Sequence, residues 1–276
     1  MMTLHANGAN IPALGLGTWE LRGEPCAAIV EQALREGYRH IDTAIMYQNE
    51  EAVGEGIRAS GVARDDIFLT TKVWPSEMTS EAFDDAVAGS LQQLGVNHVD
   101  LLLIHWPPQE NDETLWANLL NNAAENGWTK HIGVSNFTTT QINAMVQASH
   151  RPLACNQVEH HPYIDQSKLR AVCAQHGIVL MAYCPIYRGE PLFSEPIIKE
   201  LTQKHDRTPA QIVLRWHVQQ AGCGAIPKTA TPERLAENKD IFDFALAVED
   251  MRAIKTLVGK YERLCDFEFS PEWDEA

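Results

Sequence analysis

Short apolar segments and helix-like segments alternate along the whole chain, and this alternation constrains the fold more than any other feature. Eight apolar segments are expected as strands, and a segment with helical periodicity or capping residues follows each of them. The expected strands are residues 13–18, 38–43, 66–73, 99–104, 131–135, 153–158, 178–183 and 222–227. Repeated strand–helix units predict a parallel sheet. Eight of them in 276 residues predict an α/β fold of the closed (β/α)8, or TIM, barrel type.

The composition of the expected strands fits burial on both faces, because "VDLLLI" (99–104) is almost wholly apolar without strict alternation. Asn7-Gly8 predicts an N-terminal β-hairpin ahead of the barrel. The alternative is a doubly wound open sheet, which would have a G-x-G-x-x-G turn after its first strand. The turn that begins at Gly15 has Glu20 in place of the third glycine. With no linker or break in composition, we expect residues 1–276 to form one barrel domain.

The overall charge narrows the range of partners. A net charge of −15 repels phosphate backbones, so no nucleic acid partner is expected. The longest apolar run, residues 99–106, is too short to span a bilayer, and the N-terminus lacks a signal-peptide pattern. We therefore expect a cytoplasmic protein whose partner is a small molecule rather than a membrane.

Metal ligands and disulfides are not expected from the sequence. The six cysteines are scattered without a C-x-x-C pair, which is typical of reduced thiols in an intracellular protein. His160 and His161 are adjacent, but no third ligand lies at a matching spacing, so they are interpreted as loop residues.

Polar residues gather at the carboxyl ends of the expected strands, where barrels of this kind carry their chemistry. In chain order they are Asp42, Tyr47, Lys72, His105, Ser135, Asn136, Gln157, Tyr183, Lys228, Thr229, Arg234, Glu237 and Asn238. Each alone has an ordinary interpretation as a strand-terminal or core residue. Barrel topology, however, brings neighbouring strand ends to one mouth, so these side chains are expected to lie close together.

Four of these residues suggest proton transfer to a carbonyl oxygen. A lysine ammonium beside a phenol favours the phenolate and lowers the pKa of the phenol. A carboxylate beside that lysine keeps it charged and oriented, and a histidine can hold a carbonyl oxygen in line or relay the proton. We therefore predict Tyr47 as a general acid, Lys72 and Asp42 as its partners, and His105 as the fourth catalytic residue.

Seven segments in the same order resemble the aldo-keto reductase family over essentially the whole chain. They are "GLGTW", "HIDTAIMYQNEEAVG", "TTKVW", "LLLIHWP", "IGVSNF", "NQVEHHPY" and "IPKTATPERLAEN". The resemblance implies a barrel that binds NADPH without a Rossmann domain and reduces aldehydes and ketones. It implies the same four catalytic residues, with Tyr47 as proton donor and His105 orienting the carbonyl, and it favours a monomer.

The resemblance also implies the nicotinamide site. Ser135, Asn136 and Gln157 would bind the carboxamide, and Tyr183 would stack on the ring with its flat face. Asp42 would also touch the ribose. The remaining residues implied near the cofactor are Gly17 and Thr18, which let the backbone pass close, and Cys184, which stands where relatives carry serine.

The adenosine end is expected after the eighth strand. Lys228, Thr229 and Arg234 supply two cations and a hydroxyl near a helix start, a combination suited to anions. In an acidic chain this cluster argues for the 2′-phosphate of NADP over NAD. Glu237 and Asn238 complete the expected set. The alternative is an ordinary helix start with surface charges.

The substrate pocket is predicted from the aromatic residues. Trp19, Trp74 and Trp106 follow strands and are expected to wall the pocket, although core packing is the alternative for each. The tail that contains Trp273 is expected either to fold over the mouth or to be disordered. The short loops of the chain and its closing "SPEW" resemble bacterial family members that reduce keto-sugars and small α-dicarbonyls. Short loops leave the pocket open, which predicts broad specificity.

Two other functions remain open on the sequence alone. An NADP(H)-binding regulatory module would bind the cofactor with little turnover, although it would not need an acid such as Tyr47. A barrel isomerase or lyase could instead bind a phosphorylated sugar at Lys228, and it would work without nicotinamide.

Overall fold

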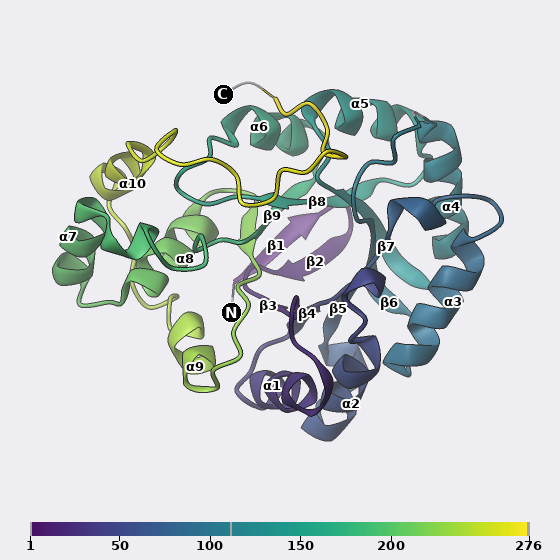
Figure 1. Cartoon of the computed structure of the whole chain (residues 1–276), viewed down its shortest axis with the longest axis horizontal. Coiled ribbons are helices and arrows are strands. Elements are labelled where there is room, and N and C mark those ends of the chain that lie inside the picture. Colours follow the sequence, from purple (N-terminus) through teal and green to yellow (C-terminus); the bar gives the residue numbers. More distant parts are fainter. Residues whose placement is uncertain (1, 111, 275–276) are drawn as a thin grey trace.

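A parallel sheet that closes on itself forms the centre of the molecule (Figure 1). The computed structural model describes residues 2–110 and 112–274. The sheet contains β3 (Leu16–Gly17), β4 (His40–Asp42), β5 (Phe68–Val73), β6 (Val99–Ile104), β7 (Thr129–Ser135), β8 (Leu153–Glu159), β9 (Val179–Tyr183) and β10 (Cys223–Ala225). Each strand pairs in parallel with the next in chain order. Parallel bridges from Leu14 to Ala225 and from Gly17 to Lys228 join the two edges. The predicted (β/α)8 barrel is confirmed, and the open sheet is excluded.

Helices surround the sheet as an outer layer (Figure 1). They are α1 (Gly23–Arg35), α2 (Glu50–Ser60), α3 (Phe83–Leu94), α4 (Glu113–Glu125), α5 (Thr139–Ala148), α6 (Ser167–Gln175), α7 (Pro196–His205), α8 (Pro209–Gln219), α9 (Glu233–Lys239) and α10 (Val248–Lys255). The start of α8 is fixed by a capping box, in which Thr208 and Gln211 satisfy each other's backbone amides. Among the described residues, no helix is long and apolar enough to cross a membrane.

The predicted N-terminal hairpin is present and closes one end of the barrel. It consists of β1 (Thr3–Ala6) and β2 (Ala9–Pro12), and the turn places Asn7 and Gly8 at φ 47° and 90°. The Asn7 amide donates to the carbonyl oxygens of Leu153 (2.7 Å) and His176 (2.8 Å). Since Leu153 begins β8, the hairpin lies at the amino ends of the strands. The carboxyl ends are therefore left for a site.

Two glycines inside α2 allow this helix to pack closely against α1 and α3. A Cβ atom on Gly54 would lie 2.3 Å from the Leu94 carbonyl oxygen, and one on Gly56 would lie 2.4 Å from the Ala27 carbonyl oxygen. Glycine is unfavourable within a helix by about 1 kcal/mol relative to alanine. Its presence at these positions is therefore explained by the contacts of α2 with α3 and α1.

We predict that Gly54→Ala lowers the free energy of unfolding by about 1–3 kcal/mol, because backbone overlap outweighs the gain in helix propensity. Gly89→Ala is the matched control within α3, since a Cβ atom at that position would meet open space. That variant should be unchanged or up to about 1 kcal/mol more stable. Urea denaturation followed by circular dichroism measures both, and equal effects of the two substitutions would contradict the packing argument.

Candidate active site

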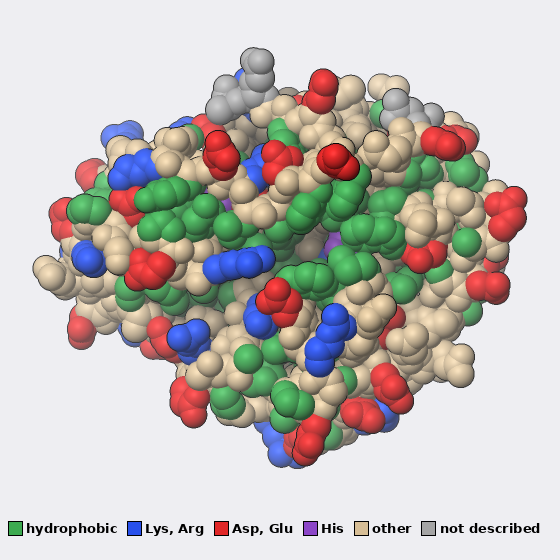
Figure 2. All heavy atoms as spheres, in the orientation of Figure 1, with side chains coloured by type: hydrophobic (Ala, Val, Ile, Leu, Met, Phe, Trp, Pro, Cys, Tyr) green, Lys and Arg blue, Asp and Glu red, His purple; other side chains and the backbone are tan. Residues whose placement is uncertain are grey.

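The four predicted catalytic residues meet at the carboxyl ends of β4, β5 and β6. Asp42 ends β4, Lys72 lies near the end of β5, and His105 directly follows β6. Tyr47 ends the short 3-10 helix η1 (Ile45–Tyr47) that follows β4. Figure 2 shows a hollow on this face, with a histidine visible inside it and hydrophobic side chains around it.

Lys72 is the centre of the group and is completely buried. Its ammonium donates to Asp42 Oδ1 at 2.6 Å, to the Thr43 carbonyl oxygen at 2.8 Å and to the Tyr47 hydroxyl at 3.1 Å. The second oxygen of Asp42 accepts from Gln157 Nε2 at 2.6 Å. Burial by itself would lower the pKa of Lys72, but Asp42, followed by Tyr47, outweighs it, so this pKa lies above its ordinary value. The lysine is therefore charged at neutral pH.

The pKa of Tyr47 departs from the sequence-based expectation. Burial raises this pKa, and the nearby Lys72 ammonium only partly offsets the effect, so the net shift is upward rather than downward. The phenol is consequently protonated at neutral pH. Because Lys72 donates its own hydrogen to the phenol oxygen, the hydroxyl hydrogen of Tyr47 is free to be donated elsewhere.

His105 is buried beside this phenol as a neutral imidazole. Burial, followed by the Lys72 charge, holds the pKa of His105 well below its ordinary value. Its ring centre lies 5.5 Å from that of Tyr47 and 5.1 Å from that of Trp74, both edge-on. Its Nδ1 atom is buried without a hydrogen-bond partner among the described residues.

A chain of hydrogen bonds joins the residues that were expected to bind nicotinamide. The Tyr183 hydroxyl donates to Asn136 Oδ1 (2.7 Å), Asn136 Nδ2 donates to Ser135 Oγ (3.1 Å), and Ser135 Oγ donates to the Gln157 carbonyl oxygen (2.8 Å). Asn136 has φ 65°, a left-handed conformation that is uncommon for residues other than glycine and is often found at functional sites. The structure therefore brings all four residues together next to Asp42.

Gly17 and Thr18 lie at the seam where the barrel closes. A Cβ atom on Gly17 would lie 2.8 Å from the Ile226 carbonyl oxygen, so closure of the sheet requires a glycine here, whatever binds nearby. Thr18 is buried, and its hydroxyl donates to the Asp42 carbonyl oxygen at 3.0 Å. The parallel bridge from Gly17 to Lys228 places the basic cluster at the same seam.

The residues of that basic cluster differ in their exposure and in their hydrogen-bond and ion-pair partners. Lys228 is exposed, with Nζ 3.8 Å from a carboxylate oxygen of Glu20, and Arg234 is exposed and makes no ion pair with a described residue. Thr229 is buried and bonds within its own loop, to the Thr231 carbonyl oxygen. Of the other predicted members, Glu237 accepts a hydrogen bond from the Thr208 hydroxyl (2.6 Å), and Asn238 is buried. Two exposed cations therefore remain available to an anion.

The C-terminal segment, residues 263–274, lies over the mouth and contacts the predicted tryptophans. Trp106 meets Trp273 at 6.1 Å and Phe269 at 5.3 Å between ring centres, and Phe269 also meets Trp74 at 5.8 Å. Trp19 lies at the other side, 4.9 Å from the Tyr47 ring and 37% exposed. Of the two alternatives for the tail, the structure favours a segment that folds over the mouth.

Glu159 fixes this segment, and sequence reasoning did not single it out. Its carboxylate is fully buried at the end of β8 and accepts from the backbone amides of Leu264 (2.7 Å) and Cys265 (2.8 Å) and from His161 Nε2 (2.7 Å). An acidic residue directly after the predicted strand "LACNQV" was an available signal, because a buried carboxylate requires donors. Cys184, which directly follows β9, has φ 47°, also a left-handed conformation.

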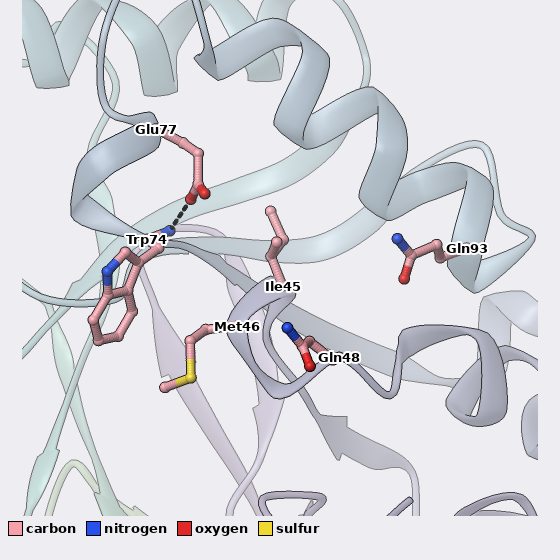
Figure 3. Close-up of a pocket in the computed structure, with 6 residues that line it drawn as sticks. All are labelled: Ile45, Met46, Gln48, Trp74, Glu77 and Gln93. Carbon is pink, nitrogen blue, oxygen red and sulfur yellow. Dashed lines mark hydrogen bonds between the residues drawn. The ribbon is translucent and has the colours of Figure 1, made fainter. Parts of the chain in front are cut away.

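A separate pocket of about 410 Å³ lies beside the mouth (Figure 3). It is lined by Ile45, Met46, Gln48, Trp74, Glu77 and Gln93. The Glu77 carboxylate accepts a hydrogen bond from the Trp74 backbone amide at 3.1 Å. This bond fixes the backbone of Trp74 and so the position of its indole ring. None of the four predicted catalytic residues lines this pocket, and Trp74 is the residue of the predicted substrate pocket that it includes.

Comparison with known proteins places the chain in a family. Residues 13–258 match the Aldo/keto reductase family. The chain is 39% identical to methylglyoxal reductase DkgA of Yersinia pestis over 254 residues, covering 91% of this chain and 90% of that one. It is also 39% identical to the glyoxal reductase of Bacillus subtilis over 259 residues, covering 94% and 92%. A crystal structure proposed to be a 2,5-diketo-D-gluconic acid reductase B superposes with a TM-score of 0.95 at 44% identity, covering 99% and 98%.

The protein belongs to the aldo/keto reductase family, as its sequence motifs indicated. It is an oxidoreductase that acts on carbonyl groups, and the family generally uses a nicotinamide nucleotide.

We predict that Glu159→Ala speeds hydrogen exchange of the Leu264 and Cys265 amides by roughly tenfold or more, since each loses a charge-assisted hydrogen bond of about 1.5–3 kcal/mol. Glu159→Gln keeps one acceptor oxygen and should give an intermediate effect. Asp274→Ala is the control, because Asp274 binds the other end of the segment to Thr139 and not to these amides. Exchange measured by mass spectrometry that is the same in Glu159→Ala and wild type would contradict the anchoring role.

Proposed function

We propose that the protein reduces aldehydes and ketones to alcohols with NADPH, with Tyr47 as the proton donor. The observation that carries this proposal is the position of Lys72, whose ammonium contacts both Asp42 Oδ1 and the Tyr47 hydroxyl at the floor of an aromatic mouth. The intact arrangement of acid, lysine and carboxylate argues for turnover rather than for a module that only binds the cofactor.

The residues present fit a nicotinamide dinucleotide. Amide and hydroxyl groups of Ser135, Asn136 and Gln157 would hold the carboxamide, and Tyr183 offers a flat ring beside them. The exposed Lys228 and Arg234 would hold the 2′-phosphate that distinguishes NADPH from NADH. When bound, the cofactor would supply the hydride for the carbonyl carbon.

The protein's own groups would handle the proton and the developing charge. Tyr47 would donate its hydroxyl hydrogen to the carbonyl oxygen, and the Lys72 ammonium would stabilise the phenolate that remains. Asp42 keeps Lys72 charged and in place throughout. His105, being neutral, can donate one N–H to the same carbonyl oxygen without adding a second positive charge beside Lys72.

Small α-dicarbonyl compounds and keto-sugars are the substrates we propose. The relatives named for methylglyoxal, glyoxal and 2,5-diketo-D-gluconic acid support this choice. In this chain, Trp19, Trp74 and Trp106 would shape the pocket, and Trp273 would contribute from the C-terminal segment. Trp19 is partly exposed, which leaves the mouth open on that side and fits a broad range of small carbonyls.

We predict that Tyr47→Phe lowers kcat by roughly 10²–10⁴-fold, the usual contribution of a general acid. The Kd for NADPH should change little, because the phenol hydroxyl is assigned to the substrate. Methylglyoxal-dependent oxidation of NADPH and fluorescence titration measure the two quantities. Tyr261→Phe removes the same hydroxyl from an exposed ring and serves as the control. Turnover retained in Tyr47→Phe would exclude this role, and saturable NADPH binding without turnover of any carbonyl by the wild type would favour the binding module.

We predict that Lys228→Ala and Arg234→Ala each weaken NADPH binding by roughly ten- to a hundredfold, the loss of one charge-assisted interaction of about 1.5–3 kcal/mol. Binding of NADH should change by less than about threefold, because it lacks the 2′-phosphate. Arg252→Ala removes an exposed arginine on α10 and controls for the change in net charge. Equal losses for NADPH and NADH would contradict the proposed contact.

A further inference from the structure

Two histidines and a cysteine meet in the core outside the catalytic mouth. His160 follows β8, whereas His217 in α8 and Cys223 at the start of β10 lie near each other but far along the chain from His160. Each has no more than 2% of its surface exposed. One nitrogen of each ring and the Cys223 sulfur all lie within 4.8 Å of one another. No local spacing around His160 and His161 could have indicated this cluster.

The nitrogens of this cluster lack partners. Both ring nitrogens of His160 and the Nδ1 atom of His217 are buried without a hydrogen bond to a described residue. Among the described residues, the Cys223 thiol hydrogen-bonds only to the Gly224 carbonyl oxygen, at 3.8 Å. An unmade hydrogen bond of a buried polar group costs about 1–3 kcal/mol. Two adjoining rings with unpartnered nitrogens, one nitrogen of each within 4.8 Å of the Cys223 sulfur, therefore indicate that a polar species belongs between these side chains.

The protonation of His217 points to a ligand that accepts electron pairs. Its Nε2 atom lies 2.9 Å from the Pro185 carbonyl oxygen, which can only accept, so the hydrogen is on Nε2. With the hydrogen on Nε2, the unpartnered Nδ1 atom carries a free lone pair. Metal-binding histidines characteristically donate their second N–H to a backbone carbonyl in this way.

We propose that His160, His217 and Cys223 bind one Zn²⁺ ion that links β8, α8 and β10. Two imidazoles and a thiolate are ligands that zinc prefers, and a water molecule can take the fourth position. At normal Zn–N and Zn–S distances the three ligand atoms would be roughly 3.3–3.6 Å apart, so the side chains would close in by about 1 Å on binding. The site would be structural, since none of its three residues belongs to the Lys72 group or lines the pocket beside the mouth.

Charges around the cluster both oppose and favour the binding of Zn²⁺. Zinc binds a cysteine as the thiolate, so the ion itself would displace the Cys223 thiol proton. The Arg170 guanidinium disfavours a further cation, but it is held by Gln220 Oε1 (2.5 Å) and the Ala221 carbonyl oxygen (3.3 Å). A thiolate ligand compensates one of the two zinc charges, which is why Cys223 is essential to the proposal.

The position of this site suggests what the ion would stabilise. His160 directly follows Glu159, which anchors the C-terminal segment, and His217 binds Pro185 in the loop after Tyr183. A zinc ion would therefore brace both the anchor of the segment and the loop beside the proposed nicotinamide site. Its presence does not depend on which carbonyl or cofactor the mouth accepts.

The test is zinc binding by the untagged full-length protein, after chelator treatment and dialysis against buffered Zn²⁺. Wild type should retain about one zinc per chain by mass spectrometry of metals, and Cys223→Ser and His160→Gln should retain less than about a tenth. Cys26→Ser replaces a buried cysteine in α1, away from the cluster, and should bind as wild type does. The zinc-loaded wild type should also melt at a higher temperature than the zinc-free protein, and the difference should vanish in His160→Gln.

Several results would overturn the proposal. Folded wild type that retains no zinc would show that the cluster holds a water molecule or nothing. Zinc retained equally by Cys223→Ser and His160→Gln would show binding elsewhere on the surface. If both variants fail to fold, the absorption spectrum of wild type loaded with Co²⁺ tests the site instead. A thiolate-to-cobalt charge-transfer band supports the site, and the absence of this band excludes it.

Discussion

The buried ion pair between Lys72 and Asp42 is the interaction on which the geometry of the mouth depends. Removing two charges from water is unfavourable, and the pair persists only because each remaining polar position is satisfied. Lys72 also donates to the Thr43 carbonyl oxygen and the Tyr47 hydroxyl, and Gln157 donates to Asp42 from across the barrel. The same contacts that satisfy the pair therefore fix the positions of the residues proposed to act on the carbonyl.

Burial around this pair sets the protonation of its neighbours. A low-dielectric surrounding disfavours the charged form of any group, so it raises the pKa of the Tyr47 phenol and lowers that of the His105 imidazole. Both residues are neutral as a result, and both can donate hydrogen. Lys72 alone remains charged, because Asp42 is close enough to outweigh desolvation. One environment thus produces two neutral donors beside a permanent cation.

Much of the fold could be predicted from local signals, whereas features that depend on tertiary contact could not. Asn7-Gly8 specifies its turn by itself, and the strand–helix alternation requires a parallel sheet. The predicted hairpin and the predicted barrel were therefore both found in the structure. The role of Gly17 in closing the sheet depends on Ile226, and the role of Glu159 depends on amides about a hundred residues away. The predicted direction of the Tyr47 pKa shift was wrong. The neighbouring lysine, which lowers this pKa, can be inferred from the sequence, whereas the depth of burial, which raises it, cannot.

The attachment of the C-terminal segment has a consequence for how this barrel diversifies. Glu159 binds the segment through backbone amides of Leu264 and Cys265, groups that are present whatever side chains those positions carry. The segment can therefore change its sequence during evolution while its anchor stays the same. The aromatic residues it places against Trp106 can be exchanged for others without disturbing β8 or the barrel beneath. Attachment by main-chain groups separates the part of the mouth that can vary from the part that must remain constant.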